Sequence, residues 1–543
     1  MAFTEANVAP STRLLDRATD SLEDRNDANN DGDVNLGSTE DSDPESDEDE
    51  FDWRKRFQNV MNAIDLEALK NNAVELRLSQ SKPELVAEPN LSCQVLEEPM
   101  HGSYNLVYVL EFNDSVKWVA RIPIQGTRVE EADIDRMTTD YSTLRFIRRS
   151  LGAPVPETYA FETNCDRIGV PFALMSFIDG VSVADRWFDK EWITEEKRLK
   201  ILTNLVHAMA KLQQPRFGKV GTLRFSDENT VSHLGPLHTV IEEEDEYVEE
   251  GIIHVAQCGP FNSVDGWLEH NWDTFQDVPQ TALWGRGCLE LMKLARLSIP
   301  AYLRRSNRFE IDVWDYNSQN ILIDDDCNIT GILDWDGIRV VPQGMGCTRF
   351  PSWITRDWDL GTYETAEDGD WEAIGEDSPE TLSRYRKHYA DTFASLDLPN
   401  YDPRETRLSH ILEAIKLGTQ DRFCRQYIMR TLLNHAYGSE QWPWDYPKIA
   451  KTLMNPSTRA AKAMRKQLLK QFETMWHAEW ETPELEQDKR ASRGPRRYLP
   501  RRRPAKQTNT AEKSTKEPKE DRPPSRGRAI SEYVFSKLGL SKR

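Results

Sequence analysis

The sequence predicts an α+β protein in which a small β-rich lobe precedes a large, mainly helical lobe. Two observations support this prediction. Short β-branched and aromatic runs, separated by turn residues, fill the region from Ser92 to Ile178 and predict strands. Beyond the turn at Asp179-Gly180, apolar residues recur at helical spacing.

The first lobe is expected to contain a β-meander. Its strands are predicted at residues 92–96, 105–112 and 116–122, with Asn113-Asp114-Ser115 as a tight turn. A helix over residues 136–150 follows, and its apolar side chains Met137, Tyr141, Leu144 and Phe146 are expected to face the core. Two more strands of the same sheet are expected at 159–161 and 171–178.

The second lobe is expected to consist mainly of helices. They are predicted over residues 195–213, 285–303, 379–394, 411–435 and 456–480. The acidic run EEEDEYVEE at 242–250 is expected to be exposed and to belong to an insertion in this lobe.

Charge is spread unevenly along the 543 residues. The net charge of −22 argues against general nucleic-acid binding by the folded part. Acidic residues gather in 20–52 and basic residues in 489–528, and both stretches are too poor in apolar residues to fold alone. We therefore expect a disordered acidic region at 1–55, an N-lobe at 56–180, a C-lobe at 181–485 and a disordered basic tail at 486–543. The tails are candidate protein-binding segments.

The sequence also bears on location. No stretch approaches the roughly 20 apolar residues of a membrane span, and the N-terminus lacks the features of a signal peptide. Seven scattered cysteines without a C-x-x-C pair predict reduced thiols and no zinc site. We expect a cytoplasmic protein. The basic cluster around Arg496 and Arg501 is either a nuclear-import signal or a solvated tail.

The stretch from Phe309 to Arg339 holds the candidate active site. Two short apolar runs flank an acidic turn and predict an antiparallel hairpin, which brings Asn320, before the first strand, beside Asp334, after the second. Hard oxygen ligands at this spacing suit Mg²⁺. Asp315 lies upstream at the D-x-x-x-x-N spacing of a phosphotransferase catalytic loop. The pattern predicts ATP chemistry, with plain capping of a hairpin as the alternative.

Two features of the first lobe are candidates for phosphate binding. Gly102 and Ser103 lie in a loop whose glycine lets backbone amides approach a phosphate closely, although an ordinary hairpin loop explains them equally well. Arg121 lies on the polar face of its predicted strand, and a buried arginine there needs an anion. ATP phosphates and Asp140 on the following helix are its candidate partners, and a weak salt bridge at the rim is the alternative.

Taken together, these motifs resemble those of the aminoglycoside phosphotransferase family, especially its fungal branch. They occur in family order: GSYN at 102–105, WVARIP at 118–123, PFALMSFIDG at 171–180, DYNSQNILIDDD from Asp315 and GILDWDG from Gly331. The resemblance implies a protein-kinase-like two-lobed fold. It also implies transfer of the γ-phosphoryl group of ATP, with Mg²⁺, to a hydroxyl of an unidentified small molecule.

The resemblance further implies residue roles. Asp315 would position or deprotonate the acceptor hydroxyl, while Asn320 and Asp334 would hold Mg²⁺. The nucleotide-binding set is Gly102, Ser103, Arg121, Asp140, Met175, Ser176 and Phe177, of which the last three belong to the hinge against adenine.

Some positions depart from the family pattern. Val313-Trp314 replaces the His-Gly or His-Pro that commonly precedes the catalytic aspartate, Arg121 replaces a lysine, and Asp140 replaces a longer glutamate. These departures leave open a catalytically degenerate, pseudokinase-like binding or scaffold protein.

A second open point concerns the stretch from Phe350 to Asp359. Its side chains Trp353, Asp357, Trp358 and Asp359 either form an aromatic and acidic wall for a cation or belong to the core and caps of the helical lobe.

Overall fold

The computed structural model describes residues 53–480 except 81–89, 97, 229, 246–247, 275–284, 360–362, 367–368, 400, 421–423 and 439–445. The acidic stretch 20–52 and the basic tail 486–543, with its import-signal alternative, lie outside the described residues. Among the residues that are described, no helix has the length and apolar content needed to cross a membrane.

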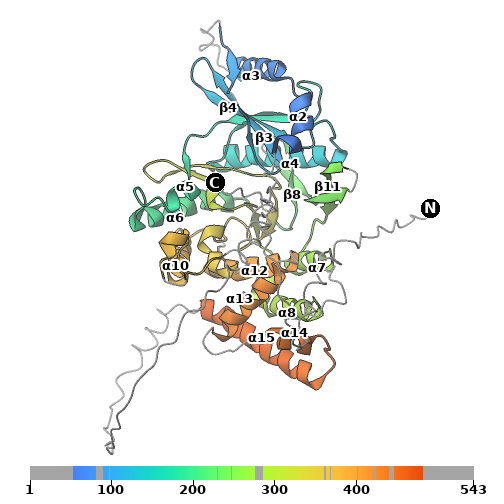
Figure 1. The fold of residues 1–543 in the computed structure, drawn as a ribbon, viewed down its shortest axis with the longest axis vertical. Helices are drawn as coiled ribbons and strands as arrows, with labels where there is room; N and C mark the ends of the chain where they lie inside the picture. Colours follow the sequence, from blue (N-terminus) through green and yellow to red (C-terminus); the bar gives the residue numbers. More distant parts are fainter. Residues whose placement is uncertain are drawn as a thin grey trace, which may run out of the picture. The chain divides into compact units, whose positions relative to one another are not determined.

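The N-terminal part of the described chain contains an antiparallel sheet (Figure 1). Its strands are β1 (Cys93–Val95), β2 (Met100–His101), β3 (Asn105–Phe112), β4 (Lys117–Pro123), β5 (Thr158–Glu162) and β6 (Phe172–Ser176). They are ordered β1-β3-β4-β6-β5, and β2 pairs with β3. The predicted meander and the two later strands are confirmed, and so is the tight turn, where Ser115 takes a left-handed φ of 67°.

Three helices precede the sheet and cover one of its faces. They are α1 (Trp53–Arg56), α2 (Gln58–Ala63) and α3 (Leu66–Gln80). Phe57, Val60 and Leu69 pack there in one hydrophobic cluster with Leu110 of β3 and Trp118 of β4. Helices before the meander were not predicted from the sequence, and α1 begins within the range 1–55 that the sequence assigns to the acidic region.

Helix α4 (Glu131–Phe146) follows β4 and lies across the sheet on its other side (Figure 1). A capping box between Glu130 and Asp133 starts it earlier than predicted, and a π-helical turn at Ile147–Leu151 ends it before the left-handed Gly152. The four apolar residues expected to face the core are buried, as predicted.

Beyond β6 the chain enters the helical part through β7 (Val181–Ser182), α5 (Val183–Trp187), α6 (Glu195–Ala210) and the short 3-10 helix η3 (Lys211–Gln213). Two antiparallel strand pairs then follow where mainly helix was expected: β8 (Thr222–Asp227) with β9 (Thr230–Gly235), and β10 (Leu237–Asp245) with β11 (Val248–Cys258). The described residues of the acidic run, 242–245 and 248–250, fall within β10 and β11.

These strand pairs attach to helix α4 through one carboxylate. Arg224 of β8 donates to Asp135 over 2.7 Å, and His238 Nε2 of β10 lies 2.8 Å from the same carboxylate. In Figure 1, β8 and β11 accordingly lie at one end of α4.

Apart from the site hairpin and the antiparallel pair β12 (Phe309–Ile311) and β15 (Val340–Pro342), the regular structure in the rest of the described chain is helical. Its α-helices are α7 (Val264–Thr274), α8 (Gly285–Ser298), α9 (Ala301–Arg304), α10 (Pro379–Ser395), α11 (Pro403–Arg407), α12 (Ser409–Gln420), α13 (Arg425–Tyr437), α14 (Tyr446–Leu453) and α15 (Arg459–Trp480). The helix predicted over 285–303 divides at Pro300, which N-caps α9. The helix predicted over 411–435 is two helices, α12 and α13.

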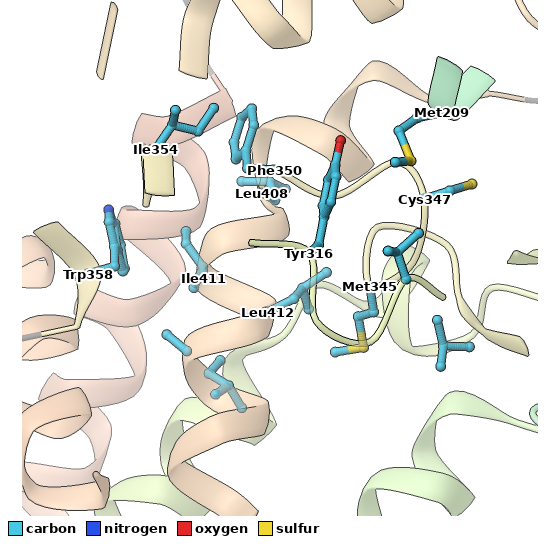
Figure 2. Close-up of a cluster of buried hydrophobic side chains, with 14 of the residues drawn as sticks. Met209, Tyr316, Met345, Cys347, Phe350, Ile354, Trp358, Leu408, Ile411 and Leu412 are labelled. Carbon is cyan, nitrogen blue, oxygen red and sulfur yellow. The ribbon is translucent and has the colours of Figure 1, made fainter. Parts of the chain in front are cut away.

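The core of the helical part reaches the candidate site. Figure 2 shows Tyr316, Phe350 and Met345 within a cluster that also includes Leu408 and Leu412 of the helical region. The hydroxyl of Tyr316 lies 2.9 Å from that of Tyr389 on α10. The residue after Asp315 is therefore fixed in the core, which limits how far Asp315 can move.

Candidate active site

The predicted hairpin is present and carries the site at one end. Strands β13 (Ile321–Ile323) and β14 (Ile329–Ile332) pair antiparallel with Ile321 opposite Ile332. The pairing continues one step further, because the N–H of Leu333 donates to the carbonyl of Asn320 over 2.8 Å. Asn320 and Asp334 therefore emerge at the same end of the hairpin.

Asn320 is linked directly to Asp315. Its side-chain Nδ2 donates to Asp315 Oδ2 over 2.9 Å and to the main-chain oxygen of Asp315 over 3.1 Å. The amide nitrogen is thus occupied in holding the aspartate, while the side-chain oxygen remains the atom that can ligate a cation. At the D-x-x-x-x-N spacing, Asn320 can therefore both hold Asp315 in place and offer its side-chain oxygen to a cation.

The surroundings of Asp315 favour its protonated form. Burial raises the pKa of Asp315, and the negative charge of Asp334 raises it further, whereas the hydrogen bond from Asn320 lowers it. A carboxylate with a raised pKa is a better proton acceptor near neutral pH than an ordinary aspartate. This environment suits a group that takes a proton from a hydroxyl.

Asp334 is bonded to Arg121 of the sheet. Arg121 Nη2 donates to Asp334 Oδ1 over 2.7 Å, although 42% of the Asp334 side chain is exposed. The backbone of Asp334 has a left-handed φ of 56°, a conformation uncommon for residues other than glycine and often found at functional sites. The aspartate is held in this orientation by its place after β14 and by the guanidinium group.

Arg121 has a second carboxylate partner that the sequence analysis missed. Its Nη1 lies 2.9 Å from Asp336 Oδ1, and Asn105 Nδ2 donates to the other oxygen of Asp336 over 2.8 Å. Two motif residues could have indicated this contact in the sequence: Asp336, the second aspartate of GILDWDG, and Asn105, the asparagine of GSYN. The expectation that Asp140 pairs with Arg121 was wrong, because Asp334 and Asp336 already fill the two ends of the guanidinium fork.

Asp140 holds a loop instead. Its carboxylate accepts hydrogen bonds from the backbone N–H groups of Gly337, over 3.1 Å, and Ile338, over 3.2 Å. Its charged partner is Arg136, one turn earlier on α4, at 3.6 Å. Burial raises the pKa of Asp140 to about 7, against the lowering effect of Arg136. Helix α4 is thereby tied to the chain that follows Asp334.

The other predicted nucleotide-binding residues make ordinary backbone contacts. The N–H of Gly102 donates to the carbonyl of Asn105 over 2.9 Å, and the carbonyl of Ser103 accepts from Arg56 Nε over 3.2 Å. In the hinge, the N–H of Ser176 donates to Glu157 and that of Phe177 to Lys117. Met175, on strand β6 of the sheet, is buried. The nucleotide roles of Gly102, Ser103, Met175, Ser176 and Phe177 stay predictions.

The side chains between Phe350 and Asp359 do not form a wall for a cation. Trp353 and Trp358 are buried in the core of the helical part. Asp357 is paired with Arg386 of α10 through two hydrogen bonds of 2.6 and 2.9 Å. The alternative, that these residues belong to the core, is the correct one.

The donor set at the end of the hairpin fits a hard divalent cation. Within the described residues, no group of three or more His, Cys, Asp or Glu side chains is placed to hold a metal ion. Mg²⁺ does not need such a group, because it is commonly held by one or two protein oxygens together with water and phosphate. The side-chain oxygen of Asn320 and the exposed carboxylate of Asp334 provide such a pair.

An antiparallel sheet crossed by one helix, followed by a helical part that bears an Asp-Asn-Asp hairpin, defines a phosphotransferase-like protein with a kinase-like fold. Residues 95–285 match the family model described as APH, phosphotransferase enzyme family. This part of the chain is similar to that family. The matched segment contains Arg121 and Asp140 and ends before Asp315, so the catalytic assignments rest on the motif and its geometry.

Fungal proteins of similar sequence match over a limited segment. A subtelomeric hrmA-associated cluster protein of Aspergillus fumigatus is 24% identical over 176 residues, which are 32% of this chain and 30% of the relative. Altered inheritance of mitochondria protein 9, mitochondrial, of Debaryomyces hansenii is 24% identical over 174 residues, 31% of this chain and 28% of the relative. The chain therefore spans less than a third of the length of these curated relatives.

Solved structures with distant likeness include two phosphotransferases. Aminoglycoside phosphotransferase APH(4)-Ia, in a ternary complex with AMP-PNP and hygromycin B, is 13% identical with a TM-score of 0.35, covering 65% of this chain and 98% of that one. Macrolide 2′-phosphotransferase from Brachybacterium faecium is 12% identical with a TM-score of 0.34, covering 69% of this chain and 97% of that one.

Proposed function

We propose that this protein is an ATP- and Mg²⁺-dependent phosphotransferase that transfers the γ-phosphoryl group to a hydroxyl of a small molecule. The observation that supports it best is the hydrogen bond between Asn320 and Asp315 at the end of the hairpin from which Asp334 also emerges. A hairpin that needed only capping would not require the half-buried carboxylate of Asp315, with its raised pKa, beside the side-chain oxygen atoms of Asn320 and Asp334.

Each group has a defined part in this chemistry. Asp315 accepts the proton of the acceptor hydroxyl and orients its oxygen toward the phosphorus. Asn320 and Asp334 would hold Mg²⁺, which would neutralise charge on the phosphate oxygens. Arg121 exchanges one of its carboxylate partners for a phosphate oxygen when ATP binds, since its planar fork suits either anion.

Replacing Asp315 by alanine tests the proposal. Release of phosphate from ATP, with water or a mixture of hydroxyl compounds as acceptor, is expected to fall about 10²- to 10⁴-fold, the usual contribution of a general base. ATP binding measured by calorimetry should be unchanged. Asp324→Ala is a matched control, because that carboxylate lies in the same hairpin but bonds only to its own turn at Asn328. Full turnover in Asp315→Ala would contradict the mechanism.

A pseudokinase-like binding protein is the second candidate. It is favoured by the two carboxylates on Arg121, which leave no unbonded cation for phosphate at this point of the described chain. This candidate requires that the wild-type protein shows no Mg²⁺-dependent ATP turnover and that its partners bind in the absence of nucleotide. Pull-downs with and without residues 489–543 would then show whether the basic tail recruits them.

A cytoplasmic location is also proposed. None of the seven cysteines, all of which lie in the described part, forms a disulfide, which agrees with a reducing compartment. Fractionation of cells that express the tagged protein tests this, and recovery in mitochondria, the location in the names of some relatives, would contradict it.

A further inference from the structure

The loop around Asp315 is held by a distant segment. Residues 313–316 lie between β12 (Phe309–Ile311) and the 3-10 helix η4 (Ser318–Asn320), outside any strand or helix. Buried carbonyl groups in such a loop need donors from elsewhere, because each one left unpaired costs free energy. The segment from Arg349 to Ser352 supplies most of them.

Arg349 donates hydrogen bonds to the two residues that precede Asp315. Its Nη2 donates to the carbonyl of Val313 over 2.6 Å and to that of Trp314 over 3.0 Å. Ser352 serves the residue that follows, because its N–H donates to the carbonyl of Tyr316 over 2.9 Å. The carbonyl of Asp315 itself accepts from the N–H of Asn317 over 2.9 Å and from Asn320. Every carbonyl from 313 to 316 is therefore fixed.

Arg349 shares the buried carboxylate of Asp312 with Arg339. Only 7% of its side chain is exposed, and its Nε lies 3.7 Å from Oδ1 of Asp312. Asp312 is 1% exposed and accepts from Arg339 Nε over 3.0 Å. Buried charges that are paired in this way have few alternative arrangements, since breaking one pair leaves another charge uncompensated.

The same cluster orients the exposed tryptophan beside Asp315. The guanidinium carbon of Arg339 lies 3.8 Å from the centre of the Trp314 ring, a cation–π contact. Val313 points the other way and is buried. Both residues that depart from the family's His-Gly or His-Pro pattern are therefore held in defined positions by the cluster of Asp312, Arg339 and Arg349.

We propose that Arg349 is a positioning residue for Asp315, and that the Asp312–Arg339–Arg349 cluster orders this catalytic loop in the absence of a histidine before the aspartate. Arg349 acts through the carbonyls of Val313 and Trp314 and touches neither ATP nor acceptor. This inference rests on the proposed function. It explains how Val313-Trp314 is compatible with catalysis.

Arg349→Met tests the inference by removing both hydrogen bonds to the loop at similar side-chain length. The kcat of Mg²⁺-dependent ATP hydrolysis, with water as acceptor, should fall about 100-fold, as expected when a catalytic group is displaced by about 1 Å. The KM for ATP should stay within about twofold, because the nucleotide contacts are unchanged. Arg349→Lys keeps the charge and one donor group, and it should recover part of the lost kcat.

Arg386→Met is the matched control. Arg386 is 11% exposed, pairs with the buried Asp357 and donates to the carbonyl of Ile354, but it makes no contact with residues 313–316 among its described bonds. Both methionine variants should lose thermal stability, and only Arg349→Met should lose kcat when assayed below its melting temperature. Equal kcat values in the two variants would overturn the inference.

Hydrogen–deuterium exchange separates this inference from the proposed function. Peptides that cover residues 313–320 should exchange faster in Arg349→Met, or in Arg349→Lys if the first variant does not fold, than in wild type or Arg386→Met. Unchanged exchange would overturn the inference even if the enzyme is active. A wild-type protein without ATP turnover would contradict the proposed function, while faster exchange in the variant would still establish the cluster as the support of this loop.

Discussion

Arg121 of β4 donates a hydrogen bond to Asp334 across 213 residues of chain and over 2.7 Å. The bond joins the sheet to the end of the β13–β14 hairpin, and Asp336 completes the arrangement on the other side of the guanidinium. Without nucleotide, the guanidinium group of Arg121 neutralises the carboxylate of Asp334, which we propose as a ligand of Mg²⁺. In the proposed function, ATP and Mg²⁺ would each provide a new partner for one member of this pair.

A double-mutant cycle measures the interaction free energy between Arg121 and Asp336. Arg121→Gln leaves Asp334 and Asp336 without their cation, and Asp336→Asn removes one of the two negative charges. Because the side chains are in contact and only 16% of Arg121 is exposed, chemical denaturation should give an interaction free energy of about 0.5–3 kcal/mol. The exposed pair Lys387–Asp391 should give less than about 1 kcal/mol. Additive effects at Arg121 and Asp336 would show that the ion pair is not formed in solution.

Asp140→Asn tests the link between helix α4 and the chain after Asp334. Asparagine keeps one acceptor and turns a donor group toward the amides of Gly337 and Ile338, so one of their hydrogen bonds is lost. We expect weaker Mg²⁺-dependent ATP binding in calorimetry and little change in the Arg121–Asp336 coupling. If that coupling disappeared as well, Asp140 would act through Arg121 rather than through the loop.

Trp314, beside Asp315, and Trp358, in the core of the helical part, should respond differently to truncation. Trp314 is 51% exposed, and Trp314→Ala should cost about 0.5–1 kcal/mol, mainly from its contact with Arg339. Trp358 is 3% exposed, and Trp358→Ala should cost about 3–5 kcal/mol. Urea denaturation measures both values. A large loss in Trp314→Ala would mean that this side chain is part of the core and not an exposed residue beside Asp315.

Glu405 predicts a pH dependence of stability. Burial raises the pKa of Glu405 from 4.5 to about 8, against the lowering effect of Arg308, its ion-pair partner. Since the folded state binds this proton more tightly than the unfolded state, the free energy of unfolding should fall as pH rises between these two values.

Glu405→Gln removes that titration. The stability difference, variant minus wild type, should therefore increase between about pH 5 and pH 8 in urea denaturation. Parallel curves over this range would contradict the raised pKa.

The strands and the hairpin were predictable because their signals are local. Alternation placed Arg121 on the polar face of β4, and the apolar runs around the acidic turn fixed the register that brings Asn320 and Asp334 to one end. Strand pairing of this kind is determined by neighbouring residues and by the turn. The same local information produced the D-x-x-x-x-N spacing from Asp315.

The remaining features depend on contacts between residues far apart in the chain. Nothing near Arg349 in the sequence indicates that its guanidinium reaches a carbonyl 36 residues earlier. The choice of Asp336 over Asp140 as a partner of Arg121 depends on where the loop after β14 lies, which no periodicity reveals. The strands β10 and β11 were missed because an acidic run resembles an exposed loop. The helices α1 and α2 were missed because they are too short for a clear pattern.

The most direct test is a thermal-shift titration with ATP, with and without Mg²⁺, on the wild-type protein and Asp334→Ala. A ligand at about 100 times its dissociation constant adds roughly 2.7 kcal/mol of stability, which such a titration detects. We predict a shift that requires Mg²⁺ in the wild type and is lost in Asp334→Ala. No shift in the wild type, or an equal Mg²⁺-dependent shift in both proteins, would contradict the assignment of this hairpin as the metal and nucleotide site.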